Sequence, residues 1–225
     1  MKRFNDKVIV ITGADSSIGR VTALKIAREG GNVVLIGSNS KVLEYIASEL
    51  PEDHTWINSG NHLAVTGDIT NEEHSERLVS HIVEKYNRID TVISINTEIK
   101  FSQALLTELS KTKGSIVNVS LLSDTSTSWS IEGYKQTQTE LEKYNKQLAY
   151  KLGPQGIRVN GVHAGLTTED SDDVDNVKLF IDQSTLGRLV EMSEITEAIL
   201  FLSSNDACMI TGATLAVDGG LSLSN

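Results

Sequence analysis

The sequence predicts an α/β protein in which a parallel β-sheet carries helices on both faces, the doubly wound arrangement. Short apolar runs typical of buried parallel strands alternate with longer segments whose apolar residues recur at helical spacing. A glycine-containing turn, residues 12–19, joins the first apolar run to the first helical pattern. The 225 residues contain no repeat, linker or low-complexity segment, so we expect one domain over residues 1–225.

The turn Thr12-Gly13-Ala14-Asp15-Ser16-Ser17-Ile18-Gly19 follows the first predicted strand, 8–11, and opens the first helix. Backbone N–H groups at such a helix start point at a bound anion, and the helix dipole favours negative charge there. Gly13 can adopt turn conformations that other residues avoid, and Gly19 lets the helix approach the strand closely. The turn therefore predicts a cradle for a nucleotide pyrophosphate. The alternative is a strand-to-helix turn without a ligand.

The remaining elements follow from local patterns, and the first helix ends at Gly30-Gly31. Further strands are predicted at 33–36, 63–65, 91–95, 115–120, 157–162 and 214–217. Further helices are predicted at 41–50, 72–87, 101–112, 133–152 and 193–203. The acidic run 169–175 lacks the glycine and terminal glutamate of a calcium loop, so we expect a solvated, mobile lid.

Composition and charge exclude several classes of partner. The net charge of −10 argues against binding to nucleic acid or to an anionic membrane surface. No apolar run has the length of a membrane span, and the basic start of the chain leads into a strand rather than a signal peptide. Cys208 is the single cysteine; it excludes an intrachain disulfide, and we expect it to be packed rather than reactive. These features predict a soluble, cytoplasmic protein with a small-molecule partner, and the histidines lack metal-site spacing.

The turn at 12–19 resembles the T-G-x-x-x-G-x-G signature of the short-chain dehydrogenase/reductase family, with Ser17 in place of the middle glycine. Other stretches that match the family's pattern are Asp68-Ile69, 153–160, Leu186-Gly187-Arg188-Leu189, 199–202, Ile210-Thr211-Gly212 and Val217-Asp218-Gly219-Gly220. The resemblance covers nearly the whole chain in the right order. It implies a Rossmann fold with strand order 3-2-1-4-5-6-7, a nicotinamide cofactor and oxidoreductase chemistry on a carbonyl or alcohol.

The resemblance also assigns the cofactor site. Its expected residues are Thr12, Gly13, Asp15, Ser17, Ile18, Gly19, Ser38, Asp68, Ile69, Asn96 and Gly165. The cofactor is NAD or NADP, because the second strand ends in Gly37-Ser38-Asn39 with neither an acid nor an arginine. Asp15 would repel a 2′-phosphate, which favours NAD slightly. The Ser17 side chain is expected to weaken binding, because it lies where backbone should approach phosphate.

Tyr134 stands where the family has its catalytic tyrosine, near the start of the long helix. A family lysine one turn later lowers the pKa of that tyrosine, but the matching residue here is Gln138. The position of the family serine holds Leu121; Ser120 is the nearest candidate, although a one-residue slip in a strand turns a side chain to the other face. Two functions therefore remain: an oxidoreductase with weak or altered activity, or a catalytically silent member that binds a nucleotide or a partner. His163, two residues before Gly165, is interpreted as a spectator more readily than as a ligand contact.

The connection after the fourth strand is shorter than the family pattern. The sequence reads Ser94-Ile95-Asn96-Thr97 where the family has Asn-Asn-Ala-Gly, and 101–106 resembles only the end of the helix that carries the family's relay asparagine. A shortened crossover is feasible, because twelve helical residues span about 18 Å and a six-residue strand about 20 Å. The loss removes surface through which family members often dimerise. Residues 193–220 resemble the family most closely, so we expect a homo-oligomer formed through this segment.

Overall fold

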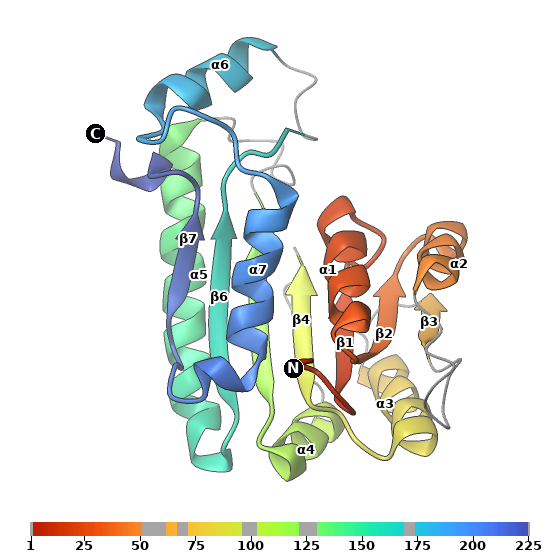
Figure 1. Ribbon diagram of the computed structural model, residues 1–225. Helices are drawn as coiled ribbons and strands as arrows, with labels where there is room; N and C mark the ends of the chain where they lie inside the picture. Colours follow the sequence, from red (N-terminus) through yellow and green to blue (C-terminus); the bar gives the residue numbers. More distant parts are fainter. Residues whose placement is uncertain are drawn as a thin grey trace.

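The computed structural model describes residues 2–50, 62–66, 72–95, 103–121, 130–168 and 174–224. Seven strands form one parallel sheet in the order β3-β2-β1-β4-β5-β6-β7, which confirms the predicted topology (Figure 1). The strands are β1 (Val8–Thr12), β2 (Asn32–Gly37), β3 (Leu63–Thr66), β4 (Thr91–Ile95), β5 (Ser115–Ser120), β6 (Arg158–Ala164) and β7 (Thr214–Val217). The order reverses direction at β1, so the carboxyl ends of β1 and β4 flank the crevice in which such sheets bind ligands.

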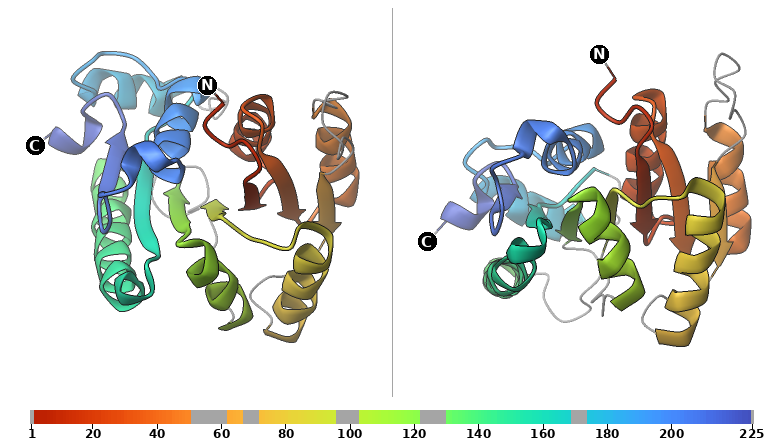
Figure 2. Two further views of the ribbon diagram at one scale, coloured as in Figure 1. Left: turned by 60° about the horizontal axis from the view of Figure 1, so that its bottom comes forward. Right: turned by 90° about the horizontal axis from the view of Figure 1, so that it is seen from below.

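Helices cover both faces of the sheet (Figure 2). They are α1 (Ser17–Arg28), α2 (Ser40–Glu49), α3 (Glu72–Tyr86), α4 (Gln103–Thr112), α5 (Ile131–Leu152), α6 (Val174–Gln183) and α7 (Met192–Ser203). One hydrophobic cluster joins α1, α2 and α7 to the sheet, and a second joins α3, α4 and α5 to the opposite face. A third, smaller cluster lies beneath α6 and holds Tyr134, Leu166, Phe180 and Leu221.

Buried amide groups fix α5 on the sheet. Asn145 of α5 is fully buried; its Oδ1 accepts a hydrogen bond of 2.7 Å from Asn118 Nδ2 on β5. Its Nδ2 donates to Thr214 Oγ1 on β7 over 2.9 Å. A Cβ at Gly161 of β6 would lie 2.1 Å from Asn145 Nδ2, so glycine is required there for space. The Asn145 amide therefore fixes the position of α5 across three strands.

The crossover from β4 to β5 closes with a short helix, as predicted. The two strands are adjacent and parallel, and α4 between them has ten residues. Leu105 and Leu109, one turn apart, are its buried residues and pack on the α3–α5 face. A helix of ten residues with one buried apolar row is therefore enough to cover this part of the sheet.

Two expectations from the sequence are wrong. Helix α6 is not among the predicted elements, because its apolar residues Val177 and Phe180 follow an acidic run that indicates an exposed loop. Most of the predicted lid, 169–173, lies outside the described residues, and 174–175 begin α6. Cys208 is exposed rather than packed.

Candidate functional site

The turn after β1 has the geometry that a phosphate cradle needs. Gly13 has a φ of +66°, and a Cβ there would lie 2.6 Å from the carbonyl oxygen of Ile95 at the end of β4. A Cβ at Gly19 would lie 2.6 Å from the carbonyl oxygen of Gly13. Both glycines are therefore required, Gly13 for conformation and space and Gly19 for space alone.

A side-chain cap fixes the start of α1. Ser16 Oγ accepts a hydrogen bond from the Gly19 N–H over 3.2 Å and donates to the Gly13 carbonyl over 2.7 Å. Ser17, the first helical residue, is exposed. The first turn of a helix leaves N–H groups without helical partners and carries the positive end of the dipole, so this exposed end suits an anion. The residues present fit a dinucleotide pyrophosphate.

Asp15 extends from the turn to the end of β2. Its Oδ2 accepts hydrogen bonds from Ser38 N at 2.8 Å, Ser38 Oγ at 2.9 Å and Asn39 N at 2.9 Å. Partial burial raises the pKa of Asp15, but the hydrogen bonds from Asn39 and Ser38 outweigh it and hold the pKa below its usual value. The carboxylate is ionised at neutral pH.

The other expected cofactor residues lie in different settings. Thr12 is buried at the end of β1, level with Ile36 of β2 and Ser94 of β4. Ile18 is buried in the core, and Gly165 follows β6, where a Cβ would lie 2.9 Å from Asp218 Cα. Asp68, Ile69 and Asn96 lie outside the described residues.

Tyr134 is enclosed by protein. Its side chain is fully buried, and its ring lies 4.2 Å from the ring of His163, centroid to centroid. Its hydroxyl donates a hydrogen bond of 3.1 Å to Asp218 Oδ2. Burial raises the pKa of Tyr134 above its usual value, and the neighbouring Asp218 carboxylate raises it further. In this arrangement the tyrosine keeps its proton and directs it at a carboxylate.

The segment after β7 covers Tyr134. Asp218 Oδ1 accepts from Gly220 N over 2.8 Å, and its Oδ2 accepts from Ser222 N over 2.9 Å. Burial raises the pKa of Asp218, but these bonds and the tyrosine hydroxyl outweigh it and lower the pKa. Leu221 packs in the cluster around Tyr134, and Lys135 Nζ donates to the Ser224 carbonyl. The C-terminal segment thus holds the tyrosine in its buried position.

The positions of the family lysine and serine carry other side chains. Gln138, one turn after Tyr134, is partly buried, and Leu121 packs against the cluster on the α1–α7 face. Ser120 lies level with His163 of β6, whose Nε2 is 3.2 Å from the Tyr134 carbonyl oxygen. Because side chains alternate along a strand, Ser120 shares the α5 face with Asn118. Ser120 therefore lies on the same face of the sheet as Tyr134.

His163 is buried between β6 and α5. Burial lowers the pKa of His163 to about 4, partly offset by its hydrogen bond with the Tyr134 backbone and by the Asp218 charge. Within the described residues its Nδ1 has no hydrogen-bond partner. The ring is neutral at pH 7 and packs against Tyr134; the spectator interpretation stays a prediction.

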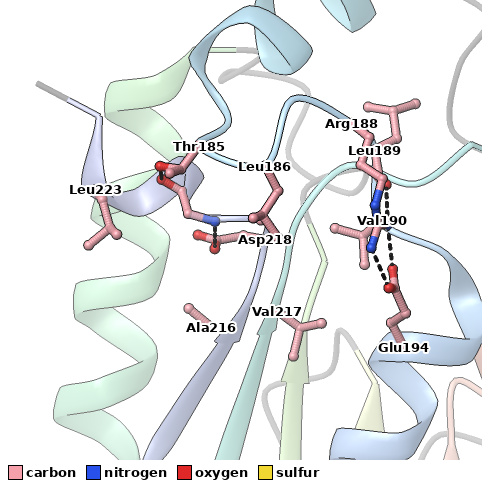
Figure 3. Close-up of a pocket in the computed structure, with 12 residues that line it drawn as sticks. Thr185, Leu186, Arg188, Leu189, Val190, Glu194, Ala216, Val217, Asp218 and Leu223 are labelled. Carbon is pink, nitrogen blue, oxygen red and sulfur yellow. Dashed lines mark hydrogen bonds and ion pairs between the residues drawn. The ribbon is translucent and has the colours of Figure 1, made fainter.

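A hollow of about 420 Å³ lies beside the end of β7 (Figure 3). Leu186 and Leu223 border one side, and the ion pair between Arg188 and Glu194, 2.6 Å apart, borders the other. Asp218 contributes to its wall. The role of Asp218 does not follow from the sequence, although an acid before two glycines of positive φ, Gly219 and Gly220, marks a tight turn.

Two kinds of site are absent from the described part of the chain. No three residues of histidine, cysteine, aspartate or glutamate there are placed to hold a metal ion. None of the helices described there is both long enough and apolar enough to cross a membrane.

The chain is similar to known dehydrogenases and reductases over nearly its whole length. Residues 7–97 match the short chain dehydrogenase profile, and residues 92–222 match the profile described as enoyl-(acyl carrier protein) reductase. The chain is 28% identical to meso-2,3-butanediol dehydrogenase of Serratia marcescens over 251 aligned positions, covering 99% of this chain and 97% of that protein. It is 29% identical to glucose 1-dehydrogenase of Gluconobacter oxydans, covering 98% and 94% of the two chains. The first alignment is longer than this chain, so the butanediol dehydrogenase has residues with no counterpart here.

Solved structures share the fold over the same length. A 7α-hydroxysteroid dehydrogenase in complex with NADH and 7-oxoglycochenodeoxycholic acid superposes with a TM-score of 0.81 at 22% identity, covering 97% of this chain and 95% of that one. A short-chain type dehydrogenase/reductase from Mycobacterium ulcerans gives 0.79 at 22% identity, with coverage of 99% and 92%. With the glycine turn, the strand order and both profiles in agreement, the chain belongs to the short-chain dehydrogenase/reductase family, whose oxidoreductases act on alcohols and carbonyls.

Proposed function

We propose that this protein binds a nicotinamide dinucleotide and acts as an oxidoreductase on an alcohol or carbonyl substrate, with slow or altered turnover. The observation that carries the proposal is the turn at 12–19, where two obligatory glycines and the Ser16 cap present the open start of α1. The relatives compared above are named as dehydrogenases of a diol, a sugar and a steroid, which supports this substrate class.

Within this proposal the turn residues Gly13, Ser17 and Gly19 hold the pyrophosphate, and Thr12 and Ile18 support them from β1 and α1. Asp68, Ile69, Asn96 and Gly165 are kept as further cofactor contacts on the family resemblance. The dinucleotide supplies hydride exchange with substrate carbon when bound. Ser17 places a side chain at the exposed start of α1, so binding is expected to be weak.

The slow turnover follows from the proton-transfer residues. A tyrosine that exchanges a proton with substrate needs an accessible hydroxyl and a pKa lowered toward neutrality. Tyr134 has a buried hydroxyl bonded to Asp218, and Gln138 supplies no cation on its helix face. Ser120 stands on the face of Tyr134 and is the hydroxyl we assign to the substrate oxygen.

A second candidate function rests on the same tyrosine. The bond from Tyr134 to Asp218 links α5 to the C-terminal segment, which is a structural role. A silent member of the family would use Tyr134 in this way and act by binding a nucleotide or a partner.

Binding and turnover separate the two candidates. We expect NADH or NADPH titration, followed by cofactor fluorescence, to show binding in both cases. Carbonyl reduction across a substrate panel is then compared between the wild type, Tyr134→Phe and Gln138→Lys, which adds a cation one turn after Tyr134. Loss of a measurable wild-type rate in Tyr134→Phe supports the enzyme. A rate that appears only in Gln138→Lys supports the silent member, and absence of any dinucleotide binding contradicts both.

The proposal also covers the location of the protein in the cell, its partners and its oligomeric state. The net charge of −10 and the single cysteine support a cytoplasmic protein without nucleic-acid or membrane partners. We also propose a homo-oligomer formed through residues 193–220.

A further inference from the structure

The carboxyl end of β2 holds an acidic group that its own residues do not supply. In dinucleotide-binding folds, an aspartate or glutamate about 20 residues after the glycine turn binds the adenosine ribose. Residues 37–39 here are glycine, serine and asparagine. The structure nevertheless places the Asp15 carboxylate there, with Oδ2 within 2.9 Å of Ser38 N, Ser38 Oγ and Asn39 N.

The Asp15 carboxylate occupies the space that a side chain at residue 37 would fill. A Cβ added to Gly37 would lie 2.5 Å from Asp15 Oδ1 and 2.6 Å from its Cγ. Gly37 does not have a positive φ, so its conformation does not require glycine. The glycine is explained by space alone, because Asp15 lies where a side chain at the end of β2 would begin.

We propose that Asp15 is the residue that recognises the adenosine ribose and selects NAD over NADP. This inference rests on the proposed function, since it concerns the same dinucleotide site. The three hydrogen bonds from residues 38 and 39 all reach Oδ2 and fix the carboxylate, and Oδ1 takes no part in them. Oδ1 accepts a hydrogen bond from the ribose 2′-hydroxyl of NAD. The 2′-phosphate of NADP would meet the negative charge instead.

The charges around the site support this direction of selectivity. The pKa of Asp15 is held below its usual value by the bonds from Asn39 and Ser38, so the group is ionised at neutral pH. Lys41, an exposed residue of α2, is a cation close to this end of β2 in the sequence. A 2′-phosphate bound by Lys41 would produce the opposite preference, which gives the test a clear alternative outcome.

The test measures dissociation constants for NADH and NADPH by fluorescence titration, without turnover. We expect the wild type to bind NADH more tightly. Asp15→Asn keeps the shape and removes the charge; it should lower the ratio of the NADPH to the NADH dissociation constant about 10- to 100-fold, the range of a hydrogen bond to a charged group. Asp206→Asn removes one exposed carboxylate elsewhere and should leave the ratio unchanged.

A second variant moves the carboxylate back to the strand. Asp15→Ala removes the γ and δ atoms that a side chain at residue 37 would meet, so Asp15→Ala with Gly37→Asp is sterically allowed. The double variant should restore the wild-type ratio, whereas Asp15→Ala alone should not. A wild type that prefers NADPH, or an Asp15→Asn variant with an unchanged ratio, overturns the inference and leaves the proposed function standing. A wild type that binds neither dinucleotide overturns the proposed function itself.

Discussion

At the scale of single residues, the hydroxyl of Tyr134 determines how the site is interpreted, because it is bonded to Asp218 rather than open to a substrate. Tyr134→Phe removes that donor and keeps the ring against His163. A hydrogen bond to a charged group contributes about 1.5–3 kcal/mol, so we expect the free energy of unfolding to fall by that amount. Urea unfolding measures it, and the affinity for NADH should not change.

The matched control is Tyr150→Phe, because Tyr150 is 89% exposed and lies on the same helix. It should leave stability unchanged. A Tyr134→Phe variant as stable as the wild type would show that the bond to Asp218 contributes nothing to the fold.

His163 should make the stability depend on pH. Its folded pKa is about 4, below the unfolded value of about 6.5, so the unfolded chain binds more protons between these values. Stability is then fully present above pH 6.5 and falls as the pH is lowered toward 4, by up to about 3 kcal/mol at 1.36 kcal/mol per unit. Urea unfolding at successive pH values measures this slope. His163→Leu should flatten the slope, and His81→Gln, at an exposed position of α3, should not.

At the scale of elements, the fit of α5 on the sheet depends on one close approach. A Cβ at Gly161 would lie 2.1 Å from Asn145 Nδ2 and 3.0 Å from Thr214 Oγ1. We expect Gly161→Ala to destabilise the protein by about 1–3 kcal/mol through overpacking. Asn145→Ala should cost a similar amount, because it leaves the buried Asn118 amide without its acceptor.

The double variant should be more stable than the sum of the two single losses predicts, because Asn145→Ala makes room for the new methyl group. Thermal or urea unfolding of all four proteins gives the coupling. Strictly additive losses would show that Gly161 and Asn145 do not compete for the same space.

Helices and strands can be predicted from the sequence where a short stretch of residues carries the whole pattern. The strand at Val8–Thr12 and the turn at 12–19 follow from an apolar run and the positions of glycine. Helix α6 was missed because Val177 and Phe180 acquire an apolar partner, Tyr134, only in the folded chain. The bond between Tyr134 and Asp218 spans 84 positions, and no local pattern encodes such a pairing. The sequence therefore predicts the phosphate cradle at 12–19, but it does not predict that the segment after β7 covers Tyr134.

At the scale of the whole molecule, the open question is where a second copy would bind. In the described sheet, β7 and β3 are the two edge strands. Edge strands offer unpaired N–H and carbonyl groups, and a lysine on the edge blocks pairing with another chain. The segment 193–220 includes β7 and Met209, which is 92% exposed. We therefore predict that two copies associate along β7.

Ala216, exposed in β7, provides the test, and Ala64, exposed in the opposite edge strand β3, provides the matched control. Sedimentation equilibrium of the wild type over a range of concentrations should show an oligomer. Ala216→Lys should shift it toward the monomer, because a charge placed at the interface must be desolvated, whereas Ala64→Lys should leave it intact. A wild type that stays monomeric at high concentration contradicts the prediction. Equal dissociation by both lysines would place the interface somewhere other than β7.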